Sequence, residues 1–270
     1  MNVKKTLLSG VLFFILILSS CTHGSSVSDD SGSSSLSSGN TAESSVTTIA
    51  TTASETVTTS ATEIEYAQVS FETVDLTAIS GDYLKSMVII GDSIAKGFSA
   101  YSKISASQVL AEGSVGARNI NDFKFSYRGV QMTLNAALES AKPKYIFMSM
   151  GMNDIRITDK ETFCKNYSNN ISTIKGICPD AKIIVVSISP VSSKSDYTTN
   201  ASIDEYNLAL SEMVKGLKNS DVFYANTAQT IKNEKGMLHD DYSSGDGIHL
   251  APIAYDYMLS YMISMLDWIR

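Results

Sequence analysis

Five runs of hydrophobic residues, most of them followed by a small polar turn, organise the chain after residue 85. The three longer runs span residues 87–90, 144–150 and 181–188, and two shorter ones span 109–111 and 222–225. Near-continuous apolar runs of this length are typical of strands covered on both faces, as in a parallel sheet. We therefore expect one sheet of about five strands.

Helical patterns fill the intervals between these runs. Thr158 and Glu161 form a capping-box signature that predicts a helix through about Ile177, and Ser202 with Glu205 repeats the signature before a second helix. Strands that alternate with helices favour a parallel sheet with helices on both faces. The fold class that we predict is α/β, a three-layer α/β/α sandwich.

A final helical pattern begins at Pro252 and ends near Trp268. Proline suits the first turn of a helix because the amide hydrogen that it lacks would have no intrahelical partner there. We expect this helix to complete the domain.

The N-terminus has the pattern of an export signal. Lys4 and Lys5 precede an apolar run over residues 11–18, which is too short for a permanent membrane span. The segment Leu18-Ser19-Ser20-Cys21 resembles the bacterial lipobox, and this resemblance implies cleavage of residues 1–20 and acylation of Cys21. We expect a lipoprotein anchored to the bacterial membrane with its domain outside the cytoplasm; the alternative is an ordinary signal peptide followed by a chance cysteine.

Residues 21–62 predict a flexible stalk. Of the 41 residues from 22 to 62, 23 are Ser or Thr, and none is Lys, Arg, Phe, Trp or Tyr. Such a segment cannot bury enough apolar surface to offset its ordering entropy. The folded domain is therefore expected over residues 63–270.

Charge is distributed unevenly along the chain. Residues 1–84 carry two basic and nine acidic residues, which leaves 19 basic and 19 acidic residues of the totals of 21 and 28 for residues 85–270. The predicted domain is electrically balanced, so nucleic acid is not an expected partner.

Cys164 and Cys178 lie near the two ends of one predicted helix. Their separation of 14 residues corresponds to about 20 Å along a helix, whereas a disulfide needs Cα atoms within about 7 Å. Two free, mostly buried thiols are expected.

Four short segments carry the candidate chemistry. Three follow predicted strands, and the fourth precedes the final helix; they are Gly91-Asp92-Ser93-Ile94, Gly113-Ser114-Val115-Gly116, Gly151-Met152-Asn153-Asp154 and Asp246-Gly247-Ile248-His249. Ligand sites in open parallel sheets lie outside the carboxyl ends of the strands. We expect these segments to meet at one site.

In this order the segments resemble the conserved blocks of the SGNH hydrolases, also called the GDSL family, over essentially the whole predicted domain. The resemblance implies Ser93 as nucleophile, Asp246 and His249 as its partners, and Gly116 and Asn153 as oxyanion-hole residues. It also implies an SGNH or flavodoxin-like fold. The first block departs from the usual pattern, since isoleucine stands where the family has leucine.

The same roles follow from chemistry. A serine hydroxyl needs an adjacent base. His249 is the best candidate, because His23 lies in the stalk and His239 lacks a carboxylate at a suitable spacing. Asp246 could orient the imidazole, and the N–H groups of Ser93 and Gly116 with the Asn153 amide could stabilise an oxyanion.

Several alternatives remain open at this stage. Gly113 competes with Gly116 as a donor, Asp240 and Asp241 compete with Asp246, and Ser93 could simply cap a helix. Asn153 could likewise be an ordinary turn residue.

Two further acids, Asp92 and Asp154, are expected to make structural hydrogen bonds near the site. We assign no catalytic role to either.

Other chemistries have little support in the sequence. It contains no Gly-x-Ser-x-Gly elbow, no His-Glu-x-x-His and no Cys-x-x-Cys, and no metal or cofactor is implied. We expect a serine esterase that hydrolyses an ester through an acyl-enzyme, with a short acyl group, such as acetyl, on carbohydrate as the preferred substrate. The alternatives are an O-acyltransferase acting on a cell-surface glycan, an esterase of the lysophospholipase or lipase type, and a binding lipoprotein without turnover.

Overall fold

The computed structural model describes residues 81–269. The predicted signal sequence, the predicted acylation site Cys21 and the predicted stalk lie outside the described residues, as do residues 63–80 of the predicted domain. Within the described part, no helix is both long enough and apolar enough to cross a membrane.

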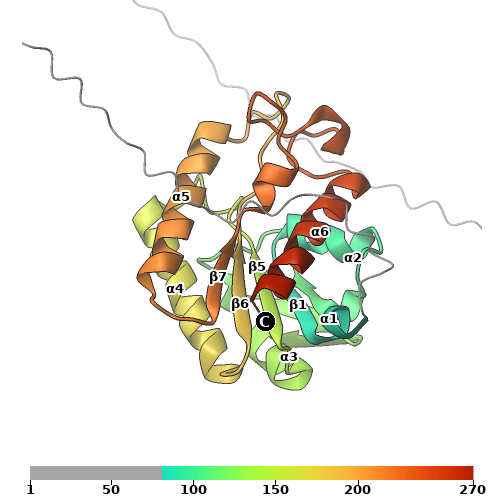
Figure 1. Ribbon diagram of the computed structural model, residues 1–270, viewed down its shortest axis with the longest axis vertical. Helices are drawn as coiled ribbons and strands as arrows, with labels where there is room; N and C mark the ends of the chain where they lie inside the picture. The colour runs from blue at the N-terminus through green and yellow to red at the C-terminus, as the bar shows by residue number, and fades with distance from the viewer. Residues whose placement is uncertain (1–80, 270) are drawn as a thin grey trace, which may run out of the picture. The chain divides into compact units, whose positions relative to one another are not determined.

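A five-stranded parallel sheet forms the centre of the domain (Figure 1). Its order is β2-β1-β5-β6-β7, and its members are β1 (Met87–Gly91), β2 (Val109–Ala111), β5 (Tyr145–Ser149), β6 (Lys182–Val186) and β7 (Val222–Ala225). The central strands β1, β5 and β6 are buried over almost their whole length. The five apolar runs in the sequence are therefore these strands, as predicted.

Helices cover both faces of the sheet (Figure 1). One apolar core packs α3 (Leu134–Ala141), α4 (Lys160–Ile177) and α5 (Asn200–Gly216) against one face. The other core packs α1 (Gly81–Ser86), α2 (Ser93–Ala100) and α6 (Pro252–Trp268) against the opposite face. The three-layer α/β/α prediction is confirmed.

Two predicted helix starts were wrong. Helix α4 is capped by Asp159, whose carboxylate accepts the N–H of Thr162 at 2.8 Å, and not by Thr158. Helix α5 is capped by Thr199, three residues before the predicted cap, and the Thr199 side chain accepts the N–H of Ser202 at 3.1 Å. In both cases a neighbouring polar side chain caps the helix equally well. The predicted start of α6 at Pro252 is confirmed.

A two-stranded antiparallel hairpin was not predicted. It consists of β3 (Lys124–Tyr127) and β4 (Val130–Thr133). Arg128 and Gly129 form its turn, and both have positive φ angles, of 51° and 79°. In sequences this turn is normally recognised from Asn-Gly or Asp-Gly. Here arginine occupies the first turn position, so the sequence did not predict the hairpin.

The two cysteines within the described region are free, as predicted. Cys178 is buried and Cys164 is partly buried, and burial raises the pKa of both thiols.

Candidate active site

Ser93 lies where β1 passes into α2. Gly91 ends the strand, and a Cβ atom there would lie 1.8 Å from the carbonyl oxygen of Ser149, so only glycine allows the close approach of β5. Asp92 caps the helix by accepting the N–H of Ile94 at 2.9 Å. Ser93 is therefore the first residue of α2 and not its cap, and its N–H has no partner within the helix.

Three side chains form a hydrogen-bonded chain at this position. His249 Nε2 lies 3.0 Å from Ser93 Oγ, and His249 Nδ1 lies 2.5 Å from Asp246 Oδ2. The side chains of His249 and Asp246 are 46% and 51% exposed. The structure thus brings together the serine, histidine and aspartate expected from the sequence, although 156 residues separate Ser93 from His249.

Asp246 organises the loop that carries His249. Its Oδ1 accepts the backbone N–H groups of Ile248 and His249 at 2.9 and 2.8 Å. Partial burial alone would raise the pKa of Asp246, but the His249 ring and these two N–H groups outweigh it and lower the pKa to about 2. The carboxylate is therefore charged at neutral pH beside the imidazole.

The competing acids lie elsewhere. Asp241 lies beside His239: its backbone N–H donates to His239 Nδ1 at 3.3 Å. Asp240 lines a separate surface hollow. Of these three acids, Asp246 is the one in contact with His249.

The loop after β2 and the loop after β5 meet beside Ser93. The Asn153 amide donates to the carbonyl oxygens of Gly113 and Val115 at 3.0 and 2.8 Å. The N–H of Gly116 donates to Asn119 Oδ1 at 2.8 Å. Two of the three expected oxyanion donors, Gly116 and Asn153, are thus engaged within the protein, and an oxyanion at Ser93 would have to share or replace these bonds.

The two glycines of this loop differ in their surroundings. A Cβ atom on Gly116 would lie 2.5 Å from Asp154 Oδ2, whereas one on Gly113 would meet nothing within 4 Å. Only Gly116 is thus required to be glycine by the packing, which favours it over Gly113 as the glycine that shapes the site.

Asp154 fastens the two loops together. Its buried carboxylate accepts the N–H of Ala117 at 2.8 Å and pairs with the Arg118 guanidinium at 3.0 Å. The structural role expected for Asp154 is therefore observed. Arg118 and Asn119 were missed in the sequence because their partners lie across a loop and not at a recognisable spacing.

Asp92, the residue before Ser93, is buried. Desolvation raises its pKa to about 6, against the lowering effect of the N–H groups of Ile94, Ala95 and Gly151. A cavity of about 10 Å³ adjoins it, lined in part by the buried serines Ser149, Ser187 and Ser189. That volume is about the size of one water molecule.

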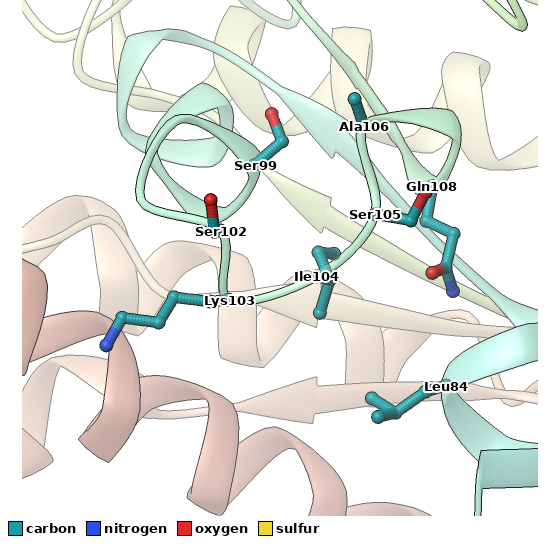
Figure 2. Close-up of a pocket in the computed structure, with 8 residues that line it drawn as sticks. All are labelled: Leu84, Ser99, Ser102, Lys103, Ile104, Ser105, Ala106 and Gln108. Atoms are coloured by element: carbon teal, nitrogen blue, oxygen red, sulfur yellow. The ribbon is translucent and has the colours of Figure 1, made fainter.

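A larger hollow lies away from these residues, at the other end of α2. It has a volume of about 570 Å³ and is shown in Figure 2. Leu84 and Ile104 contribute its apolar surface, and the Lys103 ammonium is paired with Asp256. It offers no nucleophile with an adjacent base.

Among residues 81–269, no group of three or more His, Cys, Asp or Glu residues is arranged to hold a metal ion.

Comparison with known proteins gives a family match over most of the domain. Residues 89–257 match the model of the GDSL-like lipase/acylhydrolase family. This range includes all four segments identified in the sequence. No curated protein sequence matches the chain.

Solved structures with the same fold have low sequence identity. A GDSL-like lipase from Bacteroides thetaiotaomicron has a TM-score of 0.51 at 14% identity, covering 72% of this chain and 95% of that one. A candidate acylhydrolase from Bacteroides fragilis has a TM-score of 0.51 at 15% identity, with coverages of 69% and 88%. These similarities establish the fold.

Proposed function

Since this chain belongs to the GDSL-like lipase/acylhydrolase family, whose members are hydrolases acting on esters, we propose that Ser93 attacks the ester carbonyl and carries the acyl group. The observation that carries the proposal is the hydrogen-bonded chain from Ser93 through His249 to Asp246. A serine hydroxyl is a weak nucleophile until an adjacent base takes its proton. His249 Nε2 lies within hydrogen-bonding distance of that proton.

In the first step Ser93 Oγ bonds to the carbonyl carbon while its proton moves to His249 Nε2. The resulting imidazolium then protonates the leaving alkoxide, and the ester C–O bond breaks to leave an acyl-serine. Water attacks the acyl-serine with His249 again as base, which releases the acid and restores Ser93. Asp246 accepts the hydrogen bond from the His249 Nδ1–H group throughout and stabilises the imidazolium.

The oxyanion forms beside the N-terminus of α2. The N–H of Ser93 supplies one donor, and Gly116 N–H and the Asn153 amide supply two more by exchanging their present acceptors for the oxyanion. A donor already free and aimed at the oxyanion is worth about 10² to 10³ in rate, and the exchange of acceptors reduces this gain for Gly116 and Asn153. Asp154 and Arg118 act as positioning residues, because they hold the two donor loops against each other.

We propose a short acyl group on carbohydrate as the substrate. The nearly half-exposed side chains of His249 and Asp246 support this choice, since they leave this side of the hydrogen-bonded chain open to solvent. A small acyl group needs little apolar surface, and a glycan can approach an open edge along its length.

The test is hydrolysis of p-nitrophenyl esters from acetate to decanoate, with Ser93→Ala and Asp246→Asn as variants. We expect activity confined to short chains, abolished in Ser93→Ala and lowered about 10²- to 10⁴-fold in Asp246→Asn. A preference for long chains would indicate a lipid substrate. Activity that persists in Ser93→Ala would exclude the proposed nucleophile, and acyl transfer to an added glycan would indicate a transferase.

We further propose that the protein is exported and anchored through acylated Cys21. The lipobox-like segment before Cys21 supports the proposal. In bacterial cells fed radiolabelled palmitate, the full-length protein should become labelled and Cys21→Ala should not. Equal labelling of the two would contradict the anchor.

A further inference from the structure

The loop that carries His249 is held in place by the loop that follows β6. Gly247, two residues before His249, is buried, and its carbonyl oxygen accepts the N–H of Ser192 at 2.9 Å. Gly247 has a φ angle of 83°, and a Cβ atom there would lie 2.7 Å from the backbone nitrogen of Ser195. The turn of residues 192–195 therefore packs directly against the backbone next to His249.

This turn is closed by hydrogen bonds of its own. The N–H of Ser195 donates to the carbonyl oxygen of Ser192 at 3.1 Å, and the N–H of Lys194 donates to the Ser192 hydroxyl at 3.2 Å. A turn closed in this way keeps its shape, so its position follows that of Val191, the residue before it.

Asn200, the first residue of α5, holds Val191 by both backbone groups. The carboxamide oxygen of Asn200 accepts the N–H of Val191 at 2.9 Å, and the carboxamide nitrogen donates to the Val191 carbonyl oxygen at 2.8 Å. One asparagine can make both bonds because its planar group carries an acceptor and two N–H donors. The N–H of Leu238 shares the same carbonyl oxygen at 3.0 Å.

We propose that Asn200 is a positioning residue for His249 that acts through Val191 and Gly247. The inference rests on the proposed function, because it concerns the geometry that proton transfer from Ser93 requires. A displacement of about 1 Å at the reacting groups can cost about a hundredfold in rate, even when its cause lies away from the chemistry.

Loss of the Asn200 side chain would displace this backbone. Val191 is buried, so its N–H would lose the Asn200 oxygen in a place that water reaches poorly. An unpaired buried N–H is unfavourable, and the segment should shift to find another partner. The turn of residues 192–195 and the Gly247 backbone should move with it.

His249 is sensitive to such a shift. Its Nε2 lies 3.0 Å from Ser93 Oγ, and Ser93 belongs to α2 and not to the loop of His249. A movement of that loop therefore changes this distance directly, and a hydrogen bond weakens as its distance and angle leave their optimum. Proton transfer from Ser93 should slow as a result.

Asn207 makes the same kind of contact further along α5 and provides a matched control. Its carboxamide accepts the N–H of Ile188 at 2.7 Å and donates to the Ile188 carbonyl oxygen at 3.0 Å. Ile188 packs against Gly151, where a Cβ atom would lie 2.6 Å from Ile188 Cδ1. Gly151 belongs to the loop of Asn153, so this contact supports a different side of the site.

The experiment is a double-mutant cycle on kcat for p-nitrophenyl acetate. Asn200→Ala is measured with His249 present and in the His249→Ala background, which should retain a residual rate. We expect Asn200→Ala to lower kcat about fivefold to tenfold when His249 is present and less than about twofold when it is absent. Asn207→Ala should change kcat by the same factor in both backgrounds.

The cycle separates positioning from a general loss of structure, because a general loss would lower kcat whether or not His249 is present. Circular dichroism and urea unfolding identify the temperatures at which each variant is folded. Asn200→Asp keeps the acceptor for the Val191 N–H and replaces Asn200→Ala in the cycle if the alanine variant does not fold.

Two results would overturn this inference alone, provided that the wild-type protein hydrolyses the ester. One is an unchanged kcat in Asn200→Ala, and the other is an equal loss in the two backgrounds. Absence of hydrolysis in the wild-type protein would instead overturn the proposed function, and this inference with it.

Discussion

One guanidinium nitrogen of Arg118 donates both to the buried carboxylate of Asp154, at 3.0 Å, and to the carbonyl oxygen of Asn153, at 2.7 Å. The contact joins two consecutive residues of one loop to a residue of another. Asp154 is completely buried and Arg118 is 25% exposed. The pair therefore fixes Asn153 relative to Gly116, which are two of the three proposed oxyanion donors.

Arg118→Met should lower both stability and activity. Removing one member of a buried ion pair costs about 3 to 5 kcal/mol, and because Arg118 is partly exposed we expect about 2 to 3 kcal/mol. At temperatures where the variant is folded, kcat for p-nitrophenyl acetate should fall about tenfold or more, since the donor loops lose their alignment.

Urea unfolding and steady-state kinetics measure the two effects. Arg156→Met replaces an exposed arginine and serves as the control. Full activity in folded Arg118→Met would show that the pair is not needed for positioning.

Asp92→Asn should stabilise the protein at neutral pH. Because burial raises the pKa of Asp92 from 3.8 to about 6, the folded protein holds a proton between these pH values that the unfolded chain has released. Folding stability therefore decreases as pH rises from about 4 through 6. This pKa shift corresponds to a loss of at most about 3 kcal/mol in the free energy of unfolding at pH 7. The substitution to asparagine removes the titrating group, and asparagine can still cap the helix.

Urea midpoints at pH 4.5 and pH 8 provide the test. The wild-type protein should lose more stability than Asp92→Asn between the two pH values. An equal loss in both proteins would show that Asp92 does not titrate in this range.

Gly97→Ala should destabilise α2. A Cβ atom at this position would lie 1.9 Å from the hydroxyl oxygen and 2.1 Å from the Cζ atom of Tyr255. Overpacking should outweigh the gain of about 1 kcal/mol in helix propensity and leave a net loss of about 2 kcal/mol. For a domain of this size the melting temperature should fall by about 4 to 8 °C.

The matched control is Gly176→Ala, near the end of α4, where a Cβ atom would meet nothing within 4 Å. It should raise the melting temperature. If both variants shift the temperature in the same direction, the close approach of Tyr255 to α2 would be contradicted.

Asn119→Ala should increase turnover of p-nitrophenyl acetate. Asn119 Oδ1 accepts the N–H of Gly116, so this donor must be released before it can bind an oxyanion. A neutral hydrogen bond is worth about 0.5 to 1.5 kcal/mol, which corresponds to a rise in kcat of about twofold to tenfold. Asn121→Ala, on the same loop, should leave kcat unchanged, and a lower kcat in Asn119→Ala would show that the asparagine supports the site.

The sheet and the meeting of Ser93, His249 and Asp246 could be predicted because both leave local signals. Residues 109–111 and 222–225 are strands with the predicted bounds, since burial on both faces demands continuous apolar residues. Ser93, Asn153 and His249 were recognisable because each follows a strand or precedes a helix within a short motif.

The remaining features depend on contacts that no short segment encodes. The pairing of Arg118 with Asp154 joins residues 36 positions apart. The hydrogen bond from the Gly116 N–H to Asn119 Oδ1 depends on how the loop folds. The cap of α5 was misplaced because Thr199 and Ser202 are both good capping residues, and only the packing of the helix decides between them.

The two edges of the sheet are short. β2 has three residues and β7 has four, so each edge presents few unpaired backbone N–H and C=O groups to another molecule. Long exposed edges act as templates on which strands of neighbouring chains add and aggregate. Short edges of this kind should let many copies of the domain lie close together without joining into fibres.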